Sequence, residues 1–234
     1  VPSGGRAVDA LRDTVDLLHS EPLPGLPSLT GGLVGYLTYD AVRSWEKVPD
    51  ENPDPLGLPE LGLLLATDLA VLDHADGSVL LVANAINYDA TDDNIDAAWN
   101  DAVARLDVMQ GQLAVPRPPA VSTYDSGVTP DVTSWTARED YLALVERAKE
   151  YIRAGDAFQI VGSQLFSTPC PAPALDVYRV LRTINPSPYM YLIRVPVDDG
   201  NAPDDARGAL SEQTAFEIVG SSPEALVRVT DGHC

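Results

Sequence analysis

One stretch of the chain cannot contribute a packed face, and it divides the sequence. Between Val115 and Ser134 the sequence is rich in Pro, Ser, Thr and Gly, and its apolar residues recur at neither helical nor strand spacing. We therefore expect a first folded part over residues 1–120, a linker over 121–134 and a second part over 135–234. With 234 residues and 45% hydrophobic content, the chain is long enough to build both.

The first part combines helices with strands. Apolar residues at helical spacing predict a helix near residues 6–19, and an acidic pair before Ile95 predicts the start of a second helix. Between them, Val- and Leu-rich stretches at 61–72 and 78–86 are separated by a turn at Asp76-Gly77, which is typical of a β-hairpin.

The second part begins with the best-marked helix of the chain. Thr136 and Glu139 have the spacing of a capping box, and Gly155 is placed to end the helix in a left-handed conformation. A helix over 175–184 should end at Asn185-Pro186, because proline restrains the residue before it. Apolar runs predict strands at 157–166, 189–195, 216–219 and 225–229, and the polar segment 198–215 predicts a loop.

The charge of the chain excludes several partners. With 35 acidic and 15 basic residues, its formal net charge of −20 repels nucleic acids and anionic membranes. No apolar run approaches the roughly 20 residues that span a bilayer, so we expect no membrane partner. Cys170 and Cys234 cannot build a disulfide framework, which favours a reducing, cytoplasmic location.

Common catalytic patterns are missing from the sequence. It contains no dinucleotide-binding or phosphate-binding glycine loop, no nucleophile elbow and no zinc-binding HExxH helix. His19, His74 and His233 lie far apart, and we interpret each as a surface side chain. The residues alone therefore predict no catalytic, cofactor or metal site.

Three clusters remain as candidates for a specific function. Gly31–Leu37, followed by Tyr39-Asp40, allows close backbone approach, although it also fits a plain Gly-rich strand. Asn185–Met190 places two prolines in a stiff turn that fits either a small apolar amino acid or a simple helix-to-strand connection. Ile218–Glu224 is a strand that ends in a polar turn.

Together with Ala148–Gln159, these clusters resemble, in content and order, the anthranilate synthase large-subunit family. Members of that family convert chorismate and ammonia into anthranilate and pyruvate in tryptophan biosynthesis. The resemblance extends from Gly31 to Val229, and both Asn185–Met190 and Val219–Glu224 match family signatures. It implies an α+β fold with mainly antiparallel sheets packed as a sandwich and flanked by helices.

The resemblance also implies an effector site. In the family the Pro-Tyr-Met sequence lines a pocket for the feedback inhibitor tryptophan, which assigns Pro188, Tyr189 and Met190 to effector binding, with Asn185 and Ser187 at the rim. Proline, tyrosine and methionine side chains can bury an indole ring, so the chemistry of these residue types agrees.

Gln159 bears on the branch of the family. Related isochorismate and salicylate synthases have a water-activating lysine at the matching position, whereas glutamine has no titratable proton and cannot act as a general base. The resemblance therefore favours an ammonia-using enzyme, with the folate-branch aminodeoxychorismate synthase as the alternative. Leu165 stands where the family has an arginine.

The remaining expectations come from the family as a whole. Its members use Mg²⁺ and receive ammonia from a glutamine amidotransferase small subunit. They run to about twice this length, and their metal-binding glutamates and most catalytic residues follow the portion that resembles this chain. We therefore expect no catalytic residues within these 234 residues and an inactive isolated fragment. A stand-alone amino-acid-binding regulatory module is the alternative.

Overall fold

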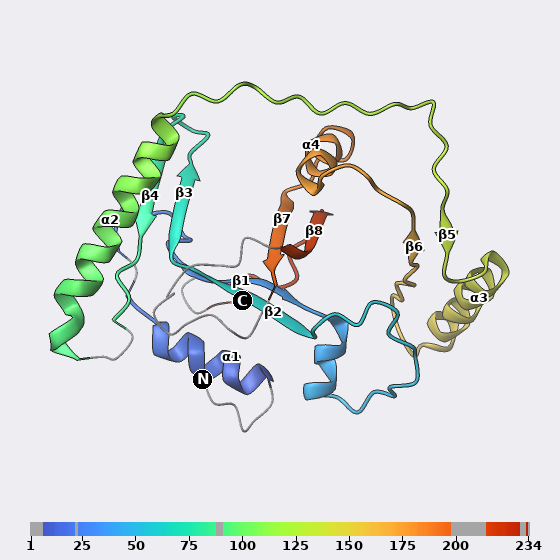
Figure 1. Cartoon of the computed structure of the whole chain (residues 1–234). Coiled ribbons are helices and arrows are strands. Elements are labelled where there is room, and N and C mark those ends of the chain that lie inside the picture. Colours follow the sequence, from blue (N-terminus) through green and yellow to red (C-terminus); the bar gives the residue numbers. More distant parts are fainter. Residues whose placement is uncertain (1–6, 22, 88–90, 198–213, 230–232, 234) are drawn as a thin grey trace. The chain divides into compact units, whose positions relative to one another are not determined.

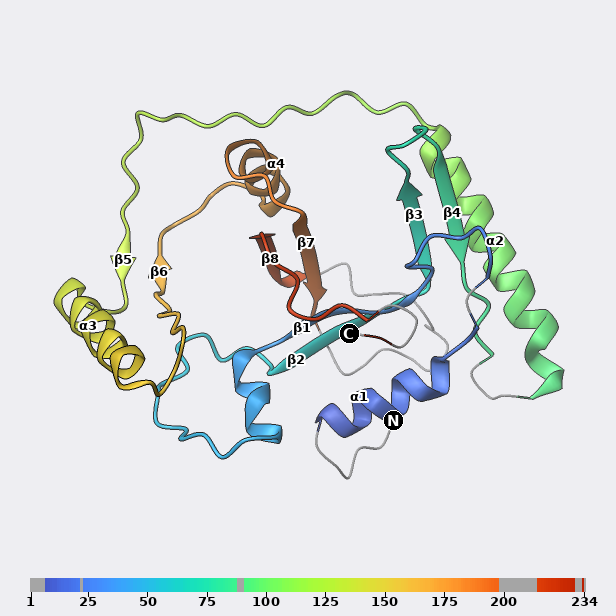
Figure 2. The same cartoon turned by 180° about the vertical axis from the view of Figure 1, so that it is seen from behind.

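The computed structural model describes residues 7–21, 23–87, 91–197, 214–229 and 233. Contacts within the chain divide it into two units, residues 1–119 and 120–234. Residues 115–132 form neither helix nor strand. Figures 1 and 2 show the described elements from opposite sides.

Unit 1 starts with the predicted helix and a two-stranded sheet. Helix α1 spans Ala7–Leu18, and strand β1 (Gly32–Leu37) pairs antiparallel with β2 (Leu61–Ala66). In this register Tyr36 lies opposite Gly62, and the Tyr36 ring occupies the space that a side chain at position 62 would need. The first glycine cluster therefore forms a strand with close cross-strand packing.

A second sheet and a long helix complete the main elements of unit 1. Strands β3 (Asp68–Leu72) and β4 (Val79–Ala83) form the predicted hairpin. Helix α2 (Ile95–Ala114) follows the short 3-10 helix η2 (Asp92–Asn94) and runs beside β4 (Figures 1 and 2).

The single strand predicted over 61–72 is wrong, because the run is divided between two sheets at Thr67. The side-chain amide of Asn84 donates hydrogen bonds to the carbonyls of Thr30 (2.8 Å) and Thr67 (2.9 Å). Arg105 of α2 pairs with Asp68 and donates to the Asn84 carbonyl at 2.8 Å. These polar contacts hold the strand ends at the break.

Arg43 and its partners fix the segment that follows β1. The 3-10 helix η1 (Tyr39–Ser44) carries Arg43, whose guanidinium pairs with Asp40 at 2.9 Å and Asp50 at 3.3 Å. The same group donates to the carbonyls of Val48 and Pro49. One arginine thus closes the loop that follows the glycine cluster.

In unit 2, helix α3 (Arg138–Ala154) confirms the best-marked sequence element. Gly155 ends it with φ of 86°, as predicted. The capping box is wrong: the N-cap is Ala137, one residue later than Thr136, and no side chain caps the helix. The Thr136 carbonyl instead accepts hydrogen bonds from Ser134 (2.6 Å) and Gln164 (3.2 Å), which holds it outside the helix.

The buried strand predicted over 157–166 is also wrong. Only Phe166–Ser167 forms a strand, β6, which pairs with β5 (Thr133–Ser134). Residues 157–165 are irregular, and the Phe158 side chain is fully exposed. A strand needs a neighbouring backbone, and the described residues provide 157–165 with no strand partner.

The end of unit 2 joins a helix to the longest sheet. Helix α4 (Ala174–Ile184) ends as predicted before Asn185-Pro186. Strand β7 (Tyr189–Pro196) pairs antiparallel with β8 (Thr214–Ser222), and α4 contacts both strands (Figure 1). β8 includes the predicted strand at 216–219 and the last two residues of the predicted loop; residues 198–213 lie outside the described residues.

The last predicted strand, 225–229, is wrong. These residues are irregular, and Leu226 is almost completely exposed. Pro223 follows β8 and donates no backbone hydrogen bond, so the antiparallel ladder does not continue past Ser222.

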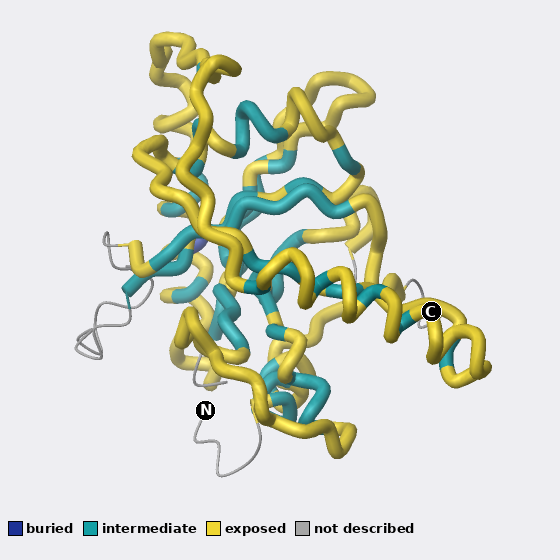
Figure 3. Tube along the Cα trace, turned by 90° about the vertical axis from the view of Figure 1, so that its right-hand side faces the viewer, coloured by how far each residue is buried: buried dark blue, intermediate teal, exposed yellow. Residues whose placement is uncertain are grey.

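Few side chains in either unit are buried among the described residues. Ala102 is the single buried apolar residue among those described, and Figure 3 shows that almost all described residues are of intermediate burial or exposed. All pairs of described strands are antiparallel, which confirms the predicted α+β class. Within the described part of the chain, no helix is long and apolar enough to cross a membrane.

Candidate functional site

The predicted effector residues lie in the connection between α4 and β7 and in the first two residues of β7. The Asn185 backbone N–H donates to the Leu181 carbonyl at 2.8 Å, closing the last turn of α4. Pro186 and Pro188 then fix the backbone direction and remove two hydrogen-bond donors. The sequence therefore folds here into a stiff turn that leads into Tyr189 and Met190, the first residues of the strand. We refer to Asn185–Met190, the segment that holds the predicted effector residues, as the effector turn.

The sheet brings two of the sequence clusters together. Tyr189 lies opposite Ser222, and Met190 lies opposite Ser221. The Ser221 hydroxyl donates a 2.7 Å hydrogen bond to the Asn185 carbonyl. The proline turn and the end of β8 are thus one structural feature, which sequence reasoning had treated as two.

A glycine and a tyrosine tighten this contact. Gly220 lies opposite Tyr191, and an added Cβ at Gly220 would be 2.1 Å from the Tyr191 ring. The ring therefore covers the glycine, as in the Tyr36–Gly62 pair of unit 1. The tyrosines that alternate along 189–195 and the glycine that follows the predicted strand 216–219 were sequence signals that could have indicated this pairing.

The five predicted site residues differ in exposure. Asn185 and Pro188 are exposed, Tyr189 keeps 45% of its surface accessible, and Met190 is half-buried. Ser187 has a hydroxyl that is enclosed without a hydrogen-bond partner among the described residues. Because successive strand residues project from opposite faces, Tyr189 and Met190 do not share a face of the sheet.

Gln159, which indicated the branch of the family, lies in the irregular segment 157–165 and is exposed. Farther along, the Gln164 amide donates to the Ser134 hydroxyl at 2.9 Å, while the Leu165 carbonyl accepts the Trp135 backbone N–H at 3.0 Å. Leu165 therefore participates in the β5–β6 connection through its backbone.

Titratable groups with shifted pKa values lie elsewhere on the surface. The Ser78 hydroxyl and backbone N–H lower the pKa of Asp76 in the β3–β4 turn. Lys149 lowers the pKa of Glu146. A hydrogen bond from Ser122, followed by one from Arg179, lowers the pKa of Asp176 at the start of α4. These shifts reflect local hydrogen bonds and ion pairs.

The part of the chain that the structure describes brings together no group of three His, Cys, Asp or Glu side chains that could hold a metal ion. His19, His74 and His233 are all exposed. Cys170 is a free, exposed thiol; Cys234 lies outside the described residues.

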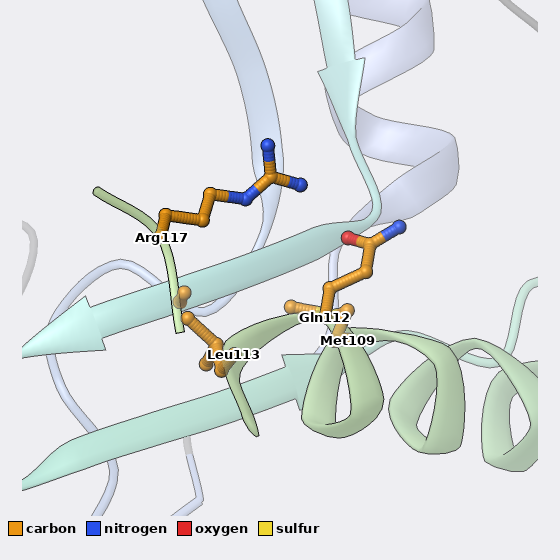
Figure 4. A pocket seen from close by; sticks show the side chains of 5 residues that line it. Met109, Gln112, Leu113 and Arg117 are labelled. Carbon is orange, nitrogen blue, oxygen red and sulfur yellow. The ribbon is translucent and has the colours of Figure 1, made fainter. Parts of the chain in front are cut away.

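Two cavities occur in unit 1, whereas the effector turn belongs to unit 2. One has a volume of about 270 Å³ and lies where the end of α2 meets β3 (Figure 4). Its lining residues are Ala70, Met109, Gln112, Leu113 and Arg117. The other, of about 330 Å³, lies between α1, η1 and the start of β2. Neither is lined by residues of the turn.

The chain is similar over nearly its whole length to known proteins. A family model described as chorismate binding enzyme matches residues 5–234. Anthranilate synthase component 1 of Mycolicibacterium smegmatis is 50% identical over 231 residues, covering 99% of this chain and 42% of the relative. The Arthrobacter globiformis protein of the same name is 46% identical over 98% of this chain and 41% of its own length.

A solved structure gives the same result. The crystal structure of anthranilate synthase component I from Streptococcus pneumoniae matches with a TM-score of 0.68 and 26% identity, covering 95% of this chain and 45% of that one. The chain thus spans less than half the length of the proteins it matches. On the strength of a family match that covers residues 5–234, the chain belongs to the chorismate binding enzyme family.

Proposed function

We propose that the protein carrying this chain is the large subunit of an anthranilate synthase. The observation that carries the proposal is the 46–50% identity, over nearly the whole chain, to relatives with that name. The reaction joins chorismate and ammonia and yields anthranilate, pyruvate and water. Its place would be tryptophan biosynthesis in the cytoplasm.

In this proposal the two parts of the chain have different roles. Residues 1–120 belong to an N-terminal regulatory portion, residues 121–134 link it to the next, and residues 135–234 begin the chorismate-binding portion. A glutamine amidotransferase small subunit supplies the ammonia. The name shared by the two relatives supports this assignment over the folate-branch aminodeoxychorismate synthase.

Magnesium is the expected cofactor. Chorismate carries two carboxylates, and a chain with a formal net charge of −20 favours their binding only if a cation screens them. A bound Mg²⁺ would supply that charge and polarise the substrate's oxygen atoms. The described residues of this chain gather no metal-ligand cluster, so we assign the ligands to the part of the relatives' length that this chain does not span.

The effector proposal places tryptophan at the turn. Pro188 and Met190 would bury the indole, Tyr189 would extend the contact around the strand, and Asn185 and Ser187 would form the polar rim. The unpaired Ser187 hydroxyl supports this assignment, because an enclosed hydroxyl without a partner is costly unless a ligand or a second conformation satisfies it. Inhibition then requires that tryptophan bind more tightly to the conformation with the poorer chorismate site.

An activity assay tests the proposed function directly. The full-length gene product is incubated with chorismate, ammonium and Mg²⁺, and the products are separated and identified. We expect anthranilate, with a rate that falls when tryptophan is added. Aminodeoxychorismate as the product would assign the protein to the folate branch, and isochorismate or salicylate would contradict the use of ammonia. Tryptophan binding without turnover would support the regulatory module.

A further inference from the structure

Two neighbouring serines at the end of β8 have different hydrogen-bond partners. The Ser221 hydroxyl donates to the Asn185 carbonyl, 36 residues earlier, at 2.7 Å. The Ser222 hydroxyl donates to the Glu224 carbonyl, two residues later, at 3.0 Å. Ser221 therefore connects β8 to the effector turn, whereas Ser222 stabilises its own turn.

Both ends of the effector turn meet at Ser221. The turn begins at Asn185, whose carbonyl accepts the Ser221 hydroxyl. It ends at Met190, which lies opposite Ser221 in the antiparallel register. The backbone N–H of Asn185 is already used by the Leu181 carbonyl, so its carbonyl is the group left to attach the turn to the sheet.

The interior of the turn offers little to replace this attachment. Pro186 and Pro188 have no backbone N–H. Ser187 carries a hydroxyl that the described residues leave unpaired. Losing the Ser221 hydroxyl would therefore leave the Asn185 carbonyl without its hydrogen-bond donor from β8. The turn would then be attached to β8 mainly through the pairing of β7 with β8.

We propose that Ser221 is a positioning residue for regulation. Its hydroxyl holds the effector turn in the conformation that binds tryptophan, and it connects the turn to β8. This inference rests on the proposed function, because it takes Asn185–Met190 as the tryptophan site. The inference adds Ser221 of β8 to the regulatory site, although Ser221 itself has no predicted contact with tryptophan.

The test compares serine variants in the full-length gene product. In Ser221→Ala the inhibition constant for tryptophan should rise roughly tenfold, which corresponds to the loss of one hydrogen bond. In the matched control Ser222→Ala it should change less than about twofold. Ser221→Thr keeps a hydroxyl and should restore inhibition. In all three, kcat and KM without tryptophan should equal those of the wild type.

A second variant and a second measurement guard against misfolding. Ser221→Cys preserves volume but donates only weakly, so it should raise the inhibition constant by an intermediate factor of about three. In the 234-residue chain, hydrogen exchange at the Asn185 amide, which donates to the Leu181 carbonyl, should accelerate in Ser221→Ala while the Leu192 and Ile193 amides of β7 stay unchanged. A purely structural defect would accelerate exchange along the whole of β7.

The outcomes separate the two proposals. A wild-type protein that forms no anthranilate refutes the proposed function. A wild-type protein that forms anthranilate and is inhibited by tryptophan, with Ser221→Ala or Ser221→Cys as sensitive as Ser222→Ala, refutes only the role of Ser221.

Discussion

Two segments of unit 2 were predicted as strands from the same kind of apolar pattern, and only one is a strand. Residues 189–195 lie in β7, paired along their whole length with β8 and contacted by α4. Residues 157–165 are irregular, with the Phe158 ring fully exposed. Both segments contain β-branched and aromatic residues, three of nine in 157–165 and four of seven in 189–195, so intrinsic preference favours β7 only moderately.

The difference lies in the availability of a partner. β7 has a neighbouring backbone within the chain, whereas 157–165 has none among the described residues. Strand formation depends on cross-strand hydrogen bonds and side-chain pairs more than on local sequence. An apolar pattern thus predicts where a strand is possible, and the partner decides where it forms.

Proline substitutions should show the largest difference between the two segments. Along an antiparallel strand, alternate N–H groups point to the partner, so one of the neighbours Leu192 and Ile193 donates to β8. Replacing that residue with proline should cost about 3 kcal/mol or more of unfolding free energy. Ile160→Pro and Val161→Pro should each cost less than about 1 kcal/mol, because their segment has no ladder to interrupt.

Urea denaturation of the 234-residue chain measures these differences. If both prolines in 192–193 were as well tolerated as those in 160–161, the pairing of β7 with β8 would not be a source of stability. An equally large loss at 160–161 would show that this segment is paired in solution.

Glycine-to-alanine changes should give a smaller contrast. At Gly220 the new Cβ would lie 2.1 Å from the Tyr191 ring, which would have to swing outward at a cost of about 1–2 kcal/mol. At Gly162 the nearest atom is the end of the Leu144 side chain at 3.1 Å, so the cost should stay near 0.5 kcal/mol. Thermal unfolding of both variants checks the order, and equal shifts would remove the proposed role of the Tyr191–Gly220 pair.

The smallest effect concerns the start of α4. Hydrogen bonds from Ser122 and Arg179 lower the pKa of Asp176, so its ionised form stabilises the fold. That contribution is present above the unfolded-state pKa and is lost as the pH falls through the lower folded-state pKa, below about pH 4. Asp176→Asn should therefore lower the melting temperature slightly at pH 7, and the difference from the wild type should shrink as the pH falls through the lowered pKa of Asp176.

The control for this prediction is Ser122→Ala, which removes the first of the two hydrogen bonds and should reproduce part of the effect. Melting curves of both variants between pH 3 and 7 provide the measurement. A difference from the wild type that did not change with pH would assign the effect to packing.

Sequence reasoning succeeded where local signals decide the structure. Gly155 ended α3 and Asn185-Pro186 ended α4 as predicted, because a left-handed position and a proline act on their own neighbourhood. The turn at Asp76-Gly77 also formed its hairpin, with the Ser78 N–H donating to the Asp76 carboxylate at 2.8 Å.

It failed where distant residues compete. Thr136 had the pattern of an N-cap, but its carbonyl is held by Gln164, 28 residues away. The break at Thr67 depends on Asn84, and no local signal marks it. In the candidate site the residues of the turn were identified by resemblance, while the Ser221–Asn185 hydrogen bond depends on a pairing that sequence reasoning did not predict.

The central functional claim is that the turn at Asn185–Met190 binds tryptophan, and calorimetric titration of the full-length gene product tests it most directly. Met190→Ala should weaken tryptophan binding by ~1–2 kcal/mol, roughly 5- to 30-fold, while leaving the rate without inhibitor intact. The chain contains one other methionine, the half-buried Met109 beside the α2 cavity, and Met109→Ala is the matched control with unchanged affinity. Equal tryptophan affinity in wild type and Met190→Ala would contradict the effector assignment and leave the turn as a rigid connection between α4 and β7.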